Sequence, residues 1–502
     1  MGVKKERAAR LLGRAVFYGS LLLVALAAVP YGSVEFWWTA LFDACVFALG
    51  MLWALESLLG GGLRLSRESF MLLLPPLALV LFSLFQTVPL WRAATAVADA
   101  PPRQAISADP FETYTFALRL LALVLLGAIW LRFTTSRRRL TALVLTVVCV
   151  GAASALFGIL RQGAQASDVG FVLPALRRGV GYGQIISRNQ FAFMMEMALG
   201  LSLGLAAARA GGFTFSLFQL SLALPVGLAL ILANSRGGIL TMLCQLLFLS
   251  LLAAPAWSRR RDENRAGFRG EDETRREAGS RSKRQSGGWR DERRAGSNGW
   301  RRRAVSLAAR LILAVALLSL VSVAVVWVGG ERVVENMSTV GEELGAGEAR
   351  EAATRWNTRR VDIWRATWEM FKENPAAGVG LGGYWAAIPR YHDASGEYTP
   401  QQAHNDYLEL LASGGLVGTA LFAWLVYALL RRAREVLRGA DRFRRAAAIG
   451  ALAGLFGVAV HSLFDFGLHL TINAALFVAL VVLATADVKA EDGKRAVAGS
   501  LS

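Results

Sequence analysis

The chain has 502 residues, 54% of them hydrophobic, and its charged residues gather between long apolar runs. This distribution excludes the two or three soluble domains that the length alone would suggest. The net charge of +18 is compatible with nucleic-acid binding, but the basic residues fall in alternate loops, as the positive-inside rule predicts for a membrane protein. We therefore expect membrane lipids among the partners, and no nucleic acid.

A bilayer core of about 30 Å is crossed by about 20 apolar helical residues. Backbone groups inside a membrane must bond within their own segment, so such stretches are predicted to be helices. They lie at residues 15–31, 34–59, 69–91, 111–132, 139–160, 189–208, 215–234, 237–257, 304–328, 407–430, 445–464 and 468–487. We expect an all-α polytopic membrane protein of about twelve transmembrane helices, with a long periplasmic loop, containing amphipathic helices, between the ninth and tenth.

The first apolar stretch follows a basic segment and resembles a signal peptide, but it runs into Pro30 and Tyr31 without a convincing cleavage site. We interpret it as a retained helix, and the basic loops then place both termini in the cytoplasm. The expected organisation is transmembrane helices one to eight at 1–257, a basic, disordered cytoplasmic loop at 258–303, helix nine at 304–328, a large periplasmic loop at 329–406, helices ten to twelve at 407–488 and a cytoplasmic tail at 489–502. The basic loop is interpreted as a solvated linker, with binding to anionic lipid headgroups as the alternative.

The periplasmic loop contains one segment with helical periodicity. Its apolar residues recur along one face: Trp356, Val361, Trp364, Trp368 and Phe371. Such a helix would lie at the membrane surface or cap a cavity. A flexible glycine turn at 378–383 is expected to follow, and it lacks the preceding strand and the acidic residue of a dinucleotide-binding fingerprint.

Arginines on the predicted outer side are candidates for binding phosphate, because a guanidinium offers a planar fork of donors that matches phosphate oxygens. Arg177, Arg178 and Arg188 precede the sixth predicted helix, and Arg236 lies in the turn before the eighth. Arg360 belongs to the amphipathic segment. The alternative is that these side chains extend to lipid headgroups. Arg188 and Arg236 favour a functional role, since each lies among small polar and glycine residues at a helix junction.

His404 precedes Asn405 and Asp406 at the start of a predicted helix. An imidazole can accept the proton of an attacking sugar hydroxyl. In the alternative interpretation, Asn405 or Asp406 caps the helix and His404 is incidental. The three cysteines lie in apolar segments and predict neither a disulfide nor a metal site.

Other polar residues carry weaker signals. His461, Asp465 and His469 share the spacing of one helical face, which suits a metal site or, as we favour, polar anchoring at the membrane interface. Glu196 is an intramembrane carboxylate, a candidate functional residue or the partner of an arginine. His392 is interpreted as a surface residue. The sequence shows no Ser-His-Asp order, P-loop or zinc signature.

Five stretches occur in an order that resembles the O-antigen ligase and polymerase superfamily of membrane glycosyltransferases. They are SRNQFAFMMEMALGLSLG at 187–204, ANSRGGIL at 233–240, RVDIWRATWEMFKENPAAGVGLGGYW at 360–385, AHNDYLELLASGGLVG at 403–418 and HSLFDFGLHLTINAALF at 461–477. The resemblance implies a GT-C-type bundle that transfers a glycan, with inversion, from undecaprenyl diphosphate to an acceptor at the periplasmic face of the bacterial inner membrane. Ligases use lipid A–core as acceptor, polymerases extend a repeat unit, and the ligases are metal-independent.

By motif position, the resemblance implies that Arg188 and Arg236 hold the diphosphate and that His404 activates the acceptor hydroxyl. Arg178, Arg360, Asn405 and Asp406 are further candidates for substrate binding, and no cofactor or metal is expected. Gln190 stands where many family members have histidine.

Two alternatives remain. A polymerase would share these motifs with a ligase, because the sequence does not identify the acceptor. A polytopic transporter of a small solute such as bicarbonate would also have about twelve helices, but repeats and polar residues near the membrane midplane are typical of transporters. Here the notable polar residues cluster at the predicted outer rim.

Overall fold

The computed structural model describes residues 2–60, 65–90, 104–164, 181–208, 212–251, 360–392 and 400–488. Within these ranges the regular structure is helical and includes no strand, only isolated bridges between Pro89 and Ala105 and between Tyr182 and Ile185. Nine of the described helices are long and apolar enough to cross a membrane, and two more apolar helices are shorter. The predicted all-α polytopic membrane protein is confirmed. The expected helix at 304–328, the basic loop at 258–303 and the tail from 489 lie outside the described residues.

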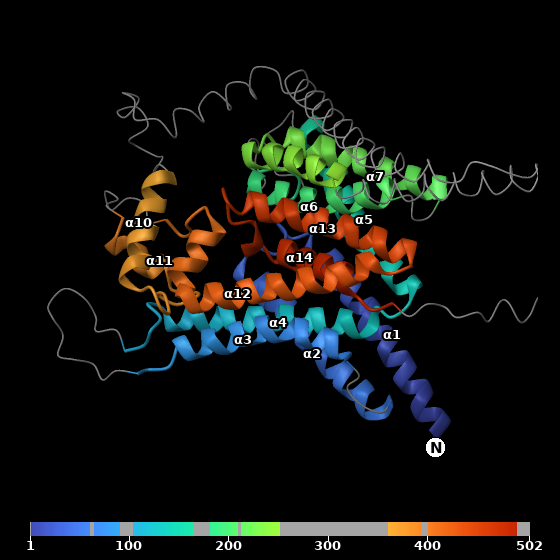
Figure 1. Cartoon of the computed structure of the whole chain (residues 1–502), viewed down its shortest axis with the longest axis horizontal. Helices are drawn as coiled ribbons and strands as arrows, with labels where there is room; N and C mark the ends of the chain where they lie inside the picture. Colours follow the sequence, from blue (N-terminus) through green and yellow to red (C-terminus); the bar gives the residue numbers. More distant parts are fainter. Residues whose placement is uncertain are drawn as a thin grey trace, which may run out of the picture.

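The helices before the long gap are α1 (Gly2–Ala27), α2 (Phe36–Gly60), α3 (Arg67–Gln86), α4 (Pro110–Phe133), α5 (Arg137–Ala164), α6 (Arg188–Ala207), α7 (Gly212–Leu232) and the helix Arg236–Leu251. Those after it are α10 (Arg360–Glu373), α11 (Tyr384–Ala387), α12 (Asp406–Arg438), α13 (Arg442–His461) and α14 (Thr471–Thr485), with short 3-10 turns at Ile388–Arg390 and Gly467–His469. The long helices run side by side as a bundle, and α10 and α11 lie at one end of it (Figure 1).

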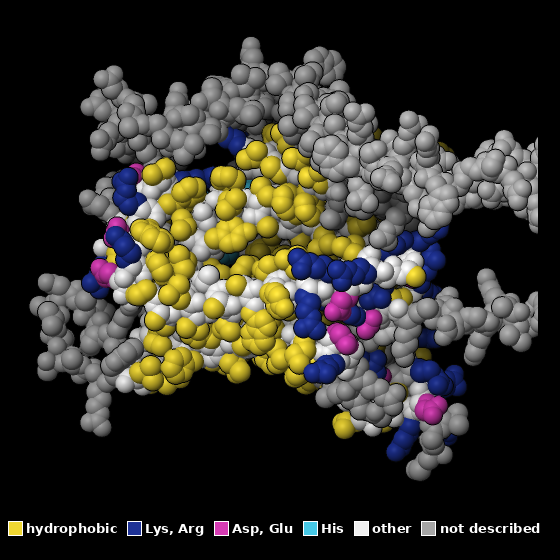
Figure 2. Space-filling model, viewed as in Figure 1, with side chains coloured by type: hydrophobic (Ala, Val, Ile, Leu, Met, Phe, Trp, Pro, Cys, Tyr) yellow, Lys and Arg dark blue, Asp and Glu magenta, His cyan; other side chains and the backbone are white. Residues whose placement is uncertain are grey.

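Apolar side chains cover the middle of the bundle surface, whereas lysines and arginines gather mainly at the end that carries the N-terminus (Figure 2). Large apolar residues such as Leu58 and Leu224 are 84% and 74% exposed. In water such a surface would be unfavourable, but it suits contact with lipid tails. The helix α6 is the exception, because it is buried on every side.

Glycines set the close contact between α6 and α13. Gly200 and Gly204 on α6 face Gly450 and Gly454 on α13, and a methyl group on Gly204 would come within 2.3 Å of the Gly450 Cα atom. Small residues spaced four apart let membrane helices approach closely enough for backbone contact. This contact fixes the register between the helices that carry Arg188 and His461.

The helix predicted at 407–430 is interrupted in the structure. Gly415 has a φ of 61°, which breaks the helical path of α12. The amides of Leu416 and Val417 donate instead to the carbonyls of Pro375 and Ala376, at 2.9 and 3.1 Å. Buried backbone groups require such partners, so the break is satisfied by the segment after α10.

The glycine turn at 378–383 is tightly packed, and the expectation that it is flexible is wrong. The amides of Val379 and Gly380 donate to the carbonyls of Ala412 and Ser413, both at 3.0 Å. Gly380 has a φ of 100°, and a Cβ atom there would lie 2.3 Å from the Ser107 hydroxyl. Glycine is needed at this position both for its conformation and for the space.

The predicted amphipathic helix is present as α10, although its buried face differs from the predicted one. Ile363, Ala366, Thr367 and Met370 are buried, whereas Trp368 is 45% exposed. Tryptophan suits the polar–apolar boundary of a membrane, which explains an apolar residue on the outer face. Two more residues of the predicted apolar face are Trp364 and Trp356. Trp364 donates from its indole nitrogen to the Ala403 carbonyl at 3.0 Å, and Trp356 lies outside the described residues.

Candidate active site

Three helix ends meet around one polar pocket. Arg188 begins α6, Arg236 begins the helix Arg236–Leu251, and His461 ends α13. The pocket has a volume of about 220 Å³. It is lined by Arg188, Asn189, Asn234, Arg236, Gly237, Arg360, His461, Phe464 and Asp465.

The local sequence directs two helix N-termini toward this pocket. Ser187 caps α6 by accepting from the Gln190 amide, and Ser235 caps the next helix by accepting from the Gly238 amide at 3.1 Å. Asn234, with a φ of 55°, provides the tight turn before Ser235. Helix N-termini carry partial positive charge and free amides, which favours an anion at this position. The lining arginines add full charges of the same sign.

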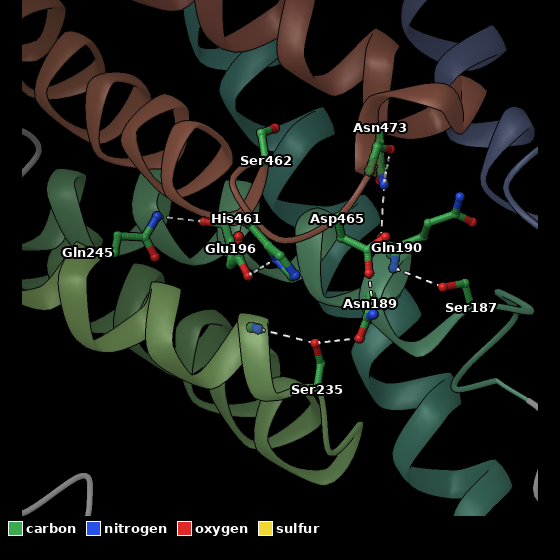
Figure 3. Close-up of polar contacts among 12 residues, drawn as sticks. Ser187, Asn189, Gln190, Glu196, Ser235, Gln245, His461, Ser462, Asp465 and Asn473 are labelled. Atoms are coloured by element: carbon green, nitrogen blue, oxygen red, sulfur yellow. Dashed lines mark hydrogen bonds and ion pairs between the residues drawn. The ribbon is translucent and has the colours of Figure 1, made fainter. Parts of the chain in front are cut away.

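Asp465 is a buried carboxylate, only 3% exposed, that connects the pocket to His404. Its Oδ1 atom lies 3.3 Å from His404 Nδ1, and its Oδ2 atom lies 3.8 Å from the Arg360 guanidinium. The Oδ2 atom also accepts a hydrogen bond from the Asn189 side-chain amide (Figure 3). Burial by itself would raise the Asp465 pKa, but the hydrogen bond and charge of His404, the charge of Arg360 and the amide of Phe466 together lower it. Asp465 is therefore ionised at neutral pH.

His404 occupies an unusual backbone conformation with a φ of 51°. The neighbouring contacts hold it there, because the Ala403 amide donates to Glu409 at 2.8 Å and the Asp406 amide donates to the Ser462 carbonyl at 2.9 Å. Non-glycine residues keep such a conformation only when the surroundings enforce it, and these cases cluster at functional sites. With Nδ1–H directed at the Asp465 carboxylate, the Nε2 atom of a neutral His404 is an acceptor. The side chain is 28% exposed, so part of the imidazole is open to a second molecule.

The predicted site residues fall into three groups. Arg188, Arg236 and Arg360 line the pocket, and His404 adjoins it through Asp465. Asn405 and Asp406 do not line it. Asn405 caps α12 by accepting from the Tyr407 and Leu408 amides, and Asp406 accepts from the Ser462 hydroxyl at 2.7 Å. Arg178 lies outside the described residues.

The interpretation of His461, Asp465 and His469 as one polar helical face is wrong, because α13 ends at His461 and a turn follows. His461 and Asp465 are 1% and 3% exposed, so neither anchors the chain at the interface. Glu196 pairs with His461 rather than with an arginine, at 2.8 Å between Oε1 and Nδ1. His392 is 8% exposed and is a buried residue, not a surface one.

The sequence analysis did not assign the other lining residues to the site, and Asn189 and Asp465 are the two of these that contact each other. Both lie in the stretches that carry the family resemblance, at 187–204 and 461–477. An asparagine beside Arg188 and an aspartate four residues after His461 were visible as a pattern, but only the folded chain brings them together. Within the described ranges, no cluster of three or more His, Cys, Asp or Glu side chains could hold a metal ion.

Comparison with known proteins gives one family match. The family model described as O-antigen ligase matches residues 220–423, a region that contains Arg236, Arg360 and His404 and leaves out Arg188 and Asp465. No curated protein sequence matches the chain. This match covers less than half of the chain, and it supports the predicted resemblance of this membrane protein to the O-antigen ligase and polymerase superfamily.

Proposed function

We propose that the chain is a membrane glycosyltransferase that moves a glycan from undecaprenyl diphosphate to an acceptor hydroxyl, as an O-antigen ligase does. One observation carries this proposal: a pocket lined by Arg188, Arg236 and Arg360 adjoins a histidine held by a buried aspartate. The arginines suit a diphosphate, and the histidine suits the hydroxyl that attacks beside it.

The leaving group determines what Arg188 and Arg236 do. As the bond between the anomeric carbon and the diphosphate oxygen breaks, that oxygen gains negative charge. The two guanidinium groups at the helix N-termini stabilise the transition state, in which this charge develops, more strongly than they stabilise the intact bound donor. Arg360 also lines the pocket and adds a third cation, and the Asp465 carboxylate 3.8 Å from it offsets its repulsion of the other two arginines.

His404 acts on the acceptor. The Asp465 carboxylate accepts the Nδ1–H bond, and Nε2 takes the proton of the acceptor hydroxyl as its oxygen attacks the anomeric carbon. Attack from the side opposite the diphosphate inverts that carbon. Asn405 and Asp406 support the start of α12 and act as positioning residues for His404.

The charge distribution supports a bacterial inner-membrane location with a periplasmic site. The basic residues from Arg431 to Arg445, in the last turns of α12, the turn that follows and the first turn of α13, lie at the bundle end remote from the pocket. The positive-inside rule places this end in the cytoplasm. The same rule puts both termini and the basic loop at 258–303 in the cytoplasm, and most of 329–406 in the periplasm.

Transport of a small solute is less well supported. The break in α12 is a feature shared with transporters, but its backbone groups are bonded by residues 375–380. The polar pocket lies at helix ends and not halfway along the helices.

Purified protein supplied with a lipid-linked glycan and an acceptor tests the proposal. The wild type should release undecaprenyl diphosphate and form a glycosylated product, and His404→Ala should lose about 10²–10⁴-fold in rate. Failure of the wild type to turn over any lipid-linked glycan would refute the proposal. Surface polysaccharide from a deletion strain then separates the two acceptors: unmodified lipid A–core indicates a ligase, and single repeat units indicate a polymerase.

A further inference from the structure

A second histidine reaches the pocket from within the bundle. His461 is 1% exposed, and its Nδ1 atom lies 2.8 Å from Oε1 of Glu196, which is fully buried in α6. Its ring stacks on Phe193, with the ring centroids 4.1 Å apart and the planes at 14°. The imidazole therefore has one fixed orientation.

The free edge of this ring faces the pocket. His461 and Gly237 both line it, and a Cβ atom on Gly237 would lie 2.6 Å from Nε2 of His461. Figure 3 shows this nitrogen on the side of the ring that faces Asn189, away from Glu196. Glycine at 237 thus leaves room for the Nε2 edge beside Arg236, where a larger side chain would collide with the ring.

Packing alone does not explain the pair. Burying a carboxylate and an imidazole costs desolvation energy that two apolar side chains would avoid. The contact between α6 and α13 is already made by Gly200, Gly204, Gly450 and Gly454. A buried ionisable pair inside a membrane segment, at the wall of a polar pocket, indicates a role in the pocket.

The proton arrangement determines that role. If Glu196 is ionised and His461 is an imidazolium, both ring nitrogens carry protons. If Glu196 holds the proton, its carboxyl donates to Nδ1, and the neutral ring carries its proton on Nε2. The third arrangement, an ionised Glu196 beside a neutral ring with Nδ1–H, would make Nε2 an acceptor, but it would leave an uncompensated charge buried in the bundle, which is costly. In the two arrangements that keep the pair neutral overall, Nε2–H is a donor on the pocket side.

We propose that His461 is a further binding residue for the donor diphosphate, in which Glu196 fixes the ring and Nε2–H donates to a phosphate oxygen. This inference rests on the proposed function, since it adds a histidine to the arginines and helix amides that donate hydrogen bonds to the same diphosphate. His404 and His461 then divide the work: His404 accepts a proton from the acceptor hydroxyl, whereas His461 donates a hydrogen bond to the leaving group.

The test compares variants by binding and by kinetics. His461→Phe keeps an aromatic ring that can stack on Phe193 but removes the Nε2–H hydrogen-bond donor. Glu196→Gln keeps a partner for Nδ1 but removes the carboxylate. Trp130→Phe is the matched control, because it removes a buried hydrogen bond of 2.9 Å between α4 and α1 and does not touch the pocket. The probes are undecaprenyl diphosphate and undecaprenyl monophosphate, titrated into the purified protein.

His461→Phe should weaken undecaprenyl diphosphate binding by about 10- to 100-fold, the range for a hydrogen bond to a charged group. Its KM for the donor should rise while its KM for the acceptor stays unchanged, and Glu196→Gln should shift both binding and donor KM less, in the same direction. Diphosphate affinity in both variants equal to that of Trp130→Phe would overturn the role of His461. A wild type that transfers no glycan and binds both lipids equally would overturn the proposed function itself.

Discussion

Asp465 holds the imidazole of His404 with 3.3 Å between Oδ1 and Nδ1, although 61 residues separate them in the sequence. The same carboxylate is 3.8 Å from Arg360. One buried acid therefore orients the proposed base and fixes an arginine of the proposed diphosphate pocket.

Asp465→Asn should reduce the rate of glycan transfer by about 10²-fold or more, the lower bound for loss of general base catalysis. The amide can donate to Nδ1, which would leave the proton on Nε2 and remove the acceptor that the hydroxyl needs. Single-turnover kinetics with saturating donor would measure the chemical step. Asp362→Asn is the control, since Asp362 lies on α10 and pairs with the exposed Arg365. Equal rates in the two variants would exclude this role for Asp465.

The lowered Asp465 pKa also predicts how stability depends on pH. A carboxyl whose pKa is lower in the folded protein than the usual 3.8 stabilises the fold above that value, and the contribution is lost as pH falls through the folded pKa. The difference in melting temperature between wild type and Asp465→Asn should therefore persist from about pH 7 to about pH 5, where the Asp465 carboxyl stays ionised. A difference that disappears within this range would mean that Asp465 is protonated there.

Arg188→Ala and Arg236→Ala should each lower the rate of transfer by about 10²–10³-fold, the cost of removing one donor that stabilises a developing anion. Lysine at either position should restore part of the rate, because it keeps the charge but not the planar fork. The matched control is Arg365→Ala, which removes a 72% exposed arginine of α10 that does not line the pocket. Near-wild-type transfer by both pocket variants would defeat the assignment.

The membrane helices could be predicted from the sequence, because the length of an apolar run shows directly whether it can cross a membrane. The segment 189–208 and the helix α6 differ by one residue at each end. Arg188 and Arg236 could be predicted because each lies among small polar and glycine residues at a helix junction, and in the structure each begins a helix after a serine cap. Local signals of this kind do not depend on the rest of the fold.

The contacts of the last helices could not be predicted in the same way. The spacing of His461, Asp465 and His469 fits one helical face, but Ser462 ends the helix and turns Asp465 toward Asn189. Likewise, nothing local shows that Gly415 breaks α12, because its backbone partners belong to residues 375 and 376. Pairings between distant segments decide both cases.

Gly415→Ala should destabilise the protein. The residue needs a φ of 61°, and the new Cβ atom would lie 2.4 Å from the Ala376 carbonyl oxygen. With φ 61° and ψ −163° Gly415 lies in a region that is essentially restricted to glycine, and a residue with a Cβ atom there costs about 1–3 kcal/mol. Gly418→Ala, on the same helix, is the control, since its nearest neighbour would be 3.6 Å away. Thermal unfolding in detergent should show a lower melting temperature for Gly415→Ala only, and a melting temperature equal to that of Gly418→Ala would contradict the strained break.

Gly204→Ala tests whether the spacing of α6 and α13 sets the geometry of the pocket. Its methyl group would lie 2.3 Å from the Gly450 Cα atom, so the helices must separate at a cost of about 1–3 kcal/mol. Gly204 is 16 residues from Arg188, or about 24 Å along the helix, and it contacts no bound substrate. Weaker binding of undecaprenyl diphosphate in Gly204→Ala would therefore report a shift of Arg188 and Glu196 relative to His461. Gly227→Ala on α7, with its nearest neighbour at 3.8 Å, should bind normally. Unchanged affinity in both variants would show that the pocket tolerates movement between these helices, and that the glycine contact serves stability alone.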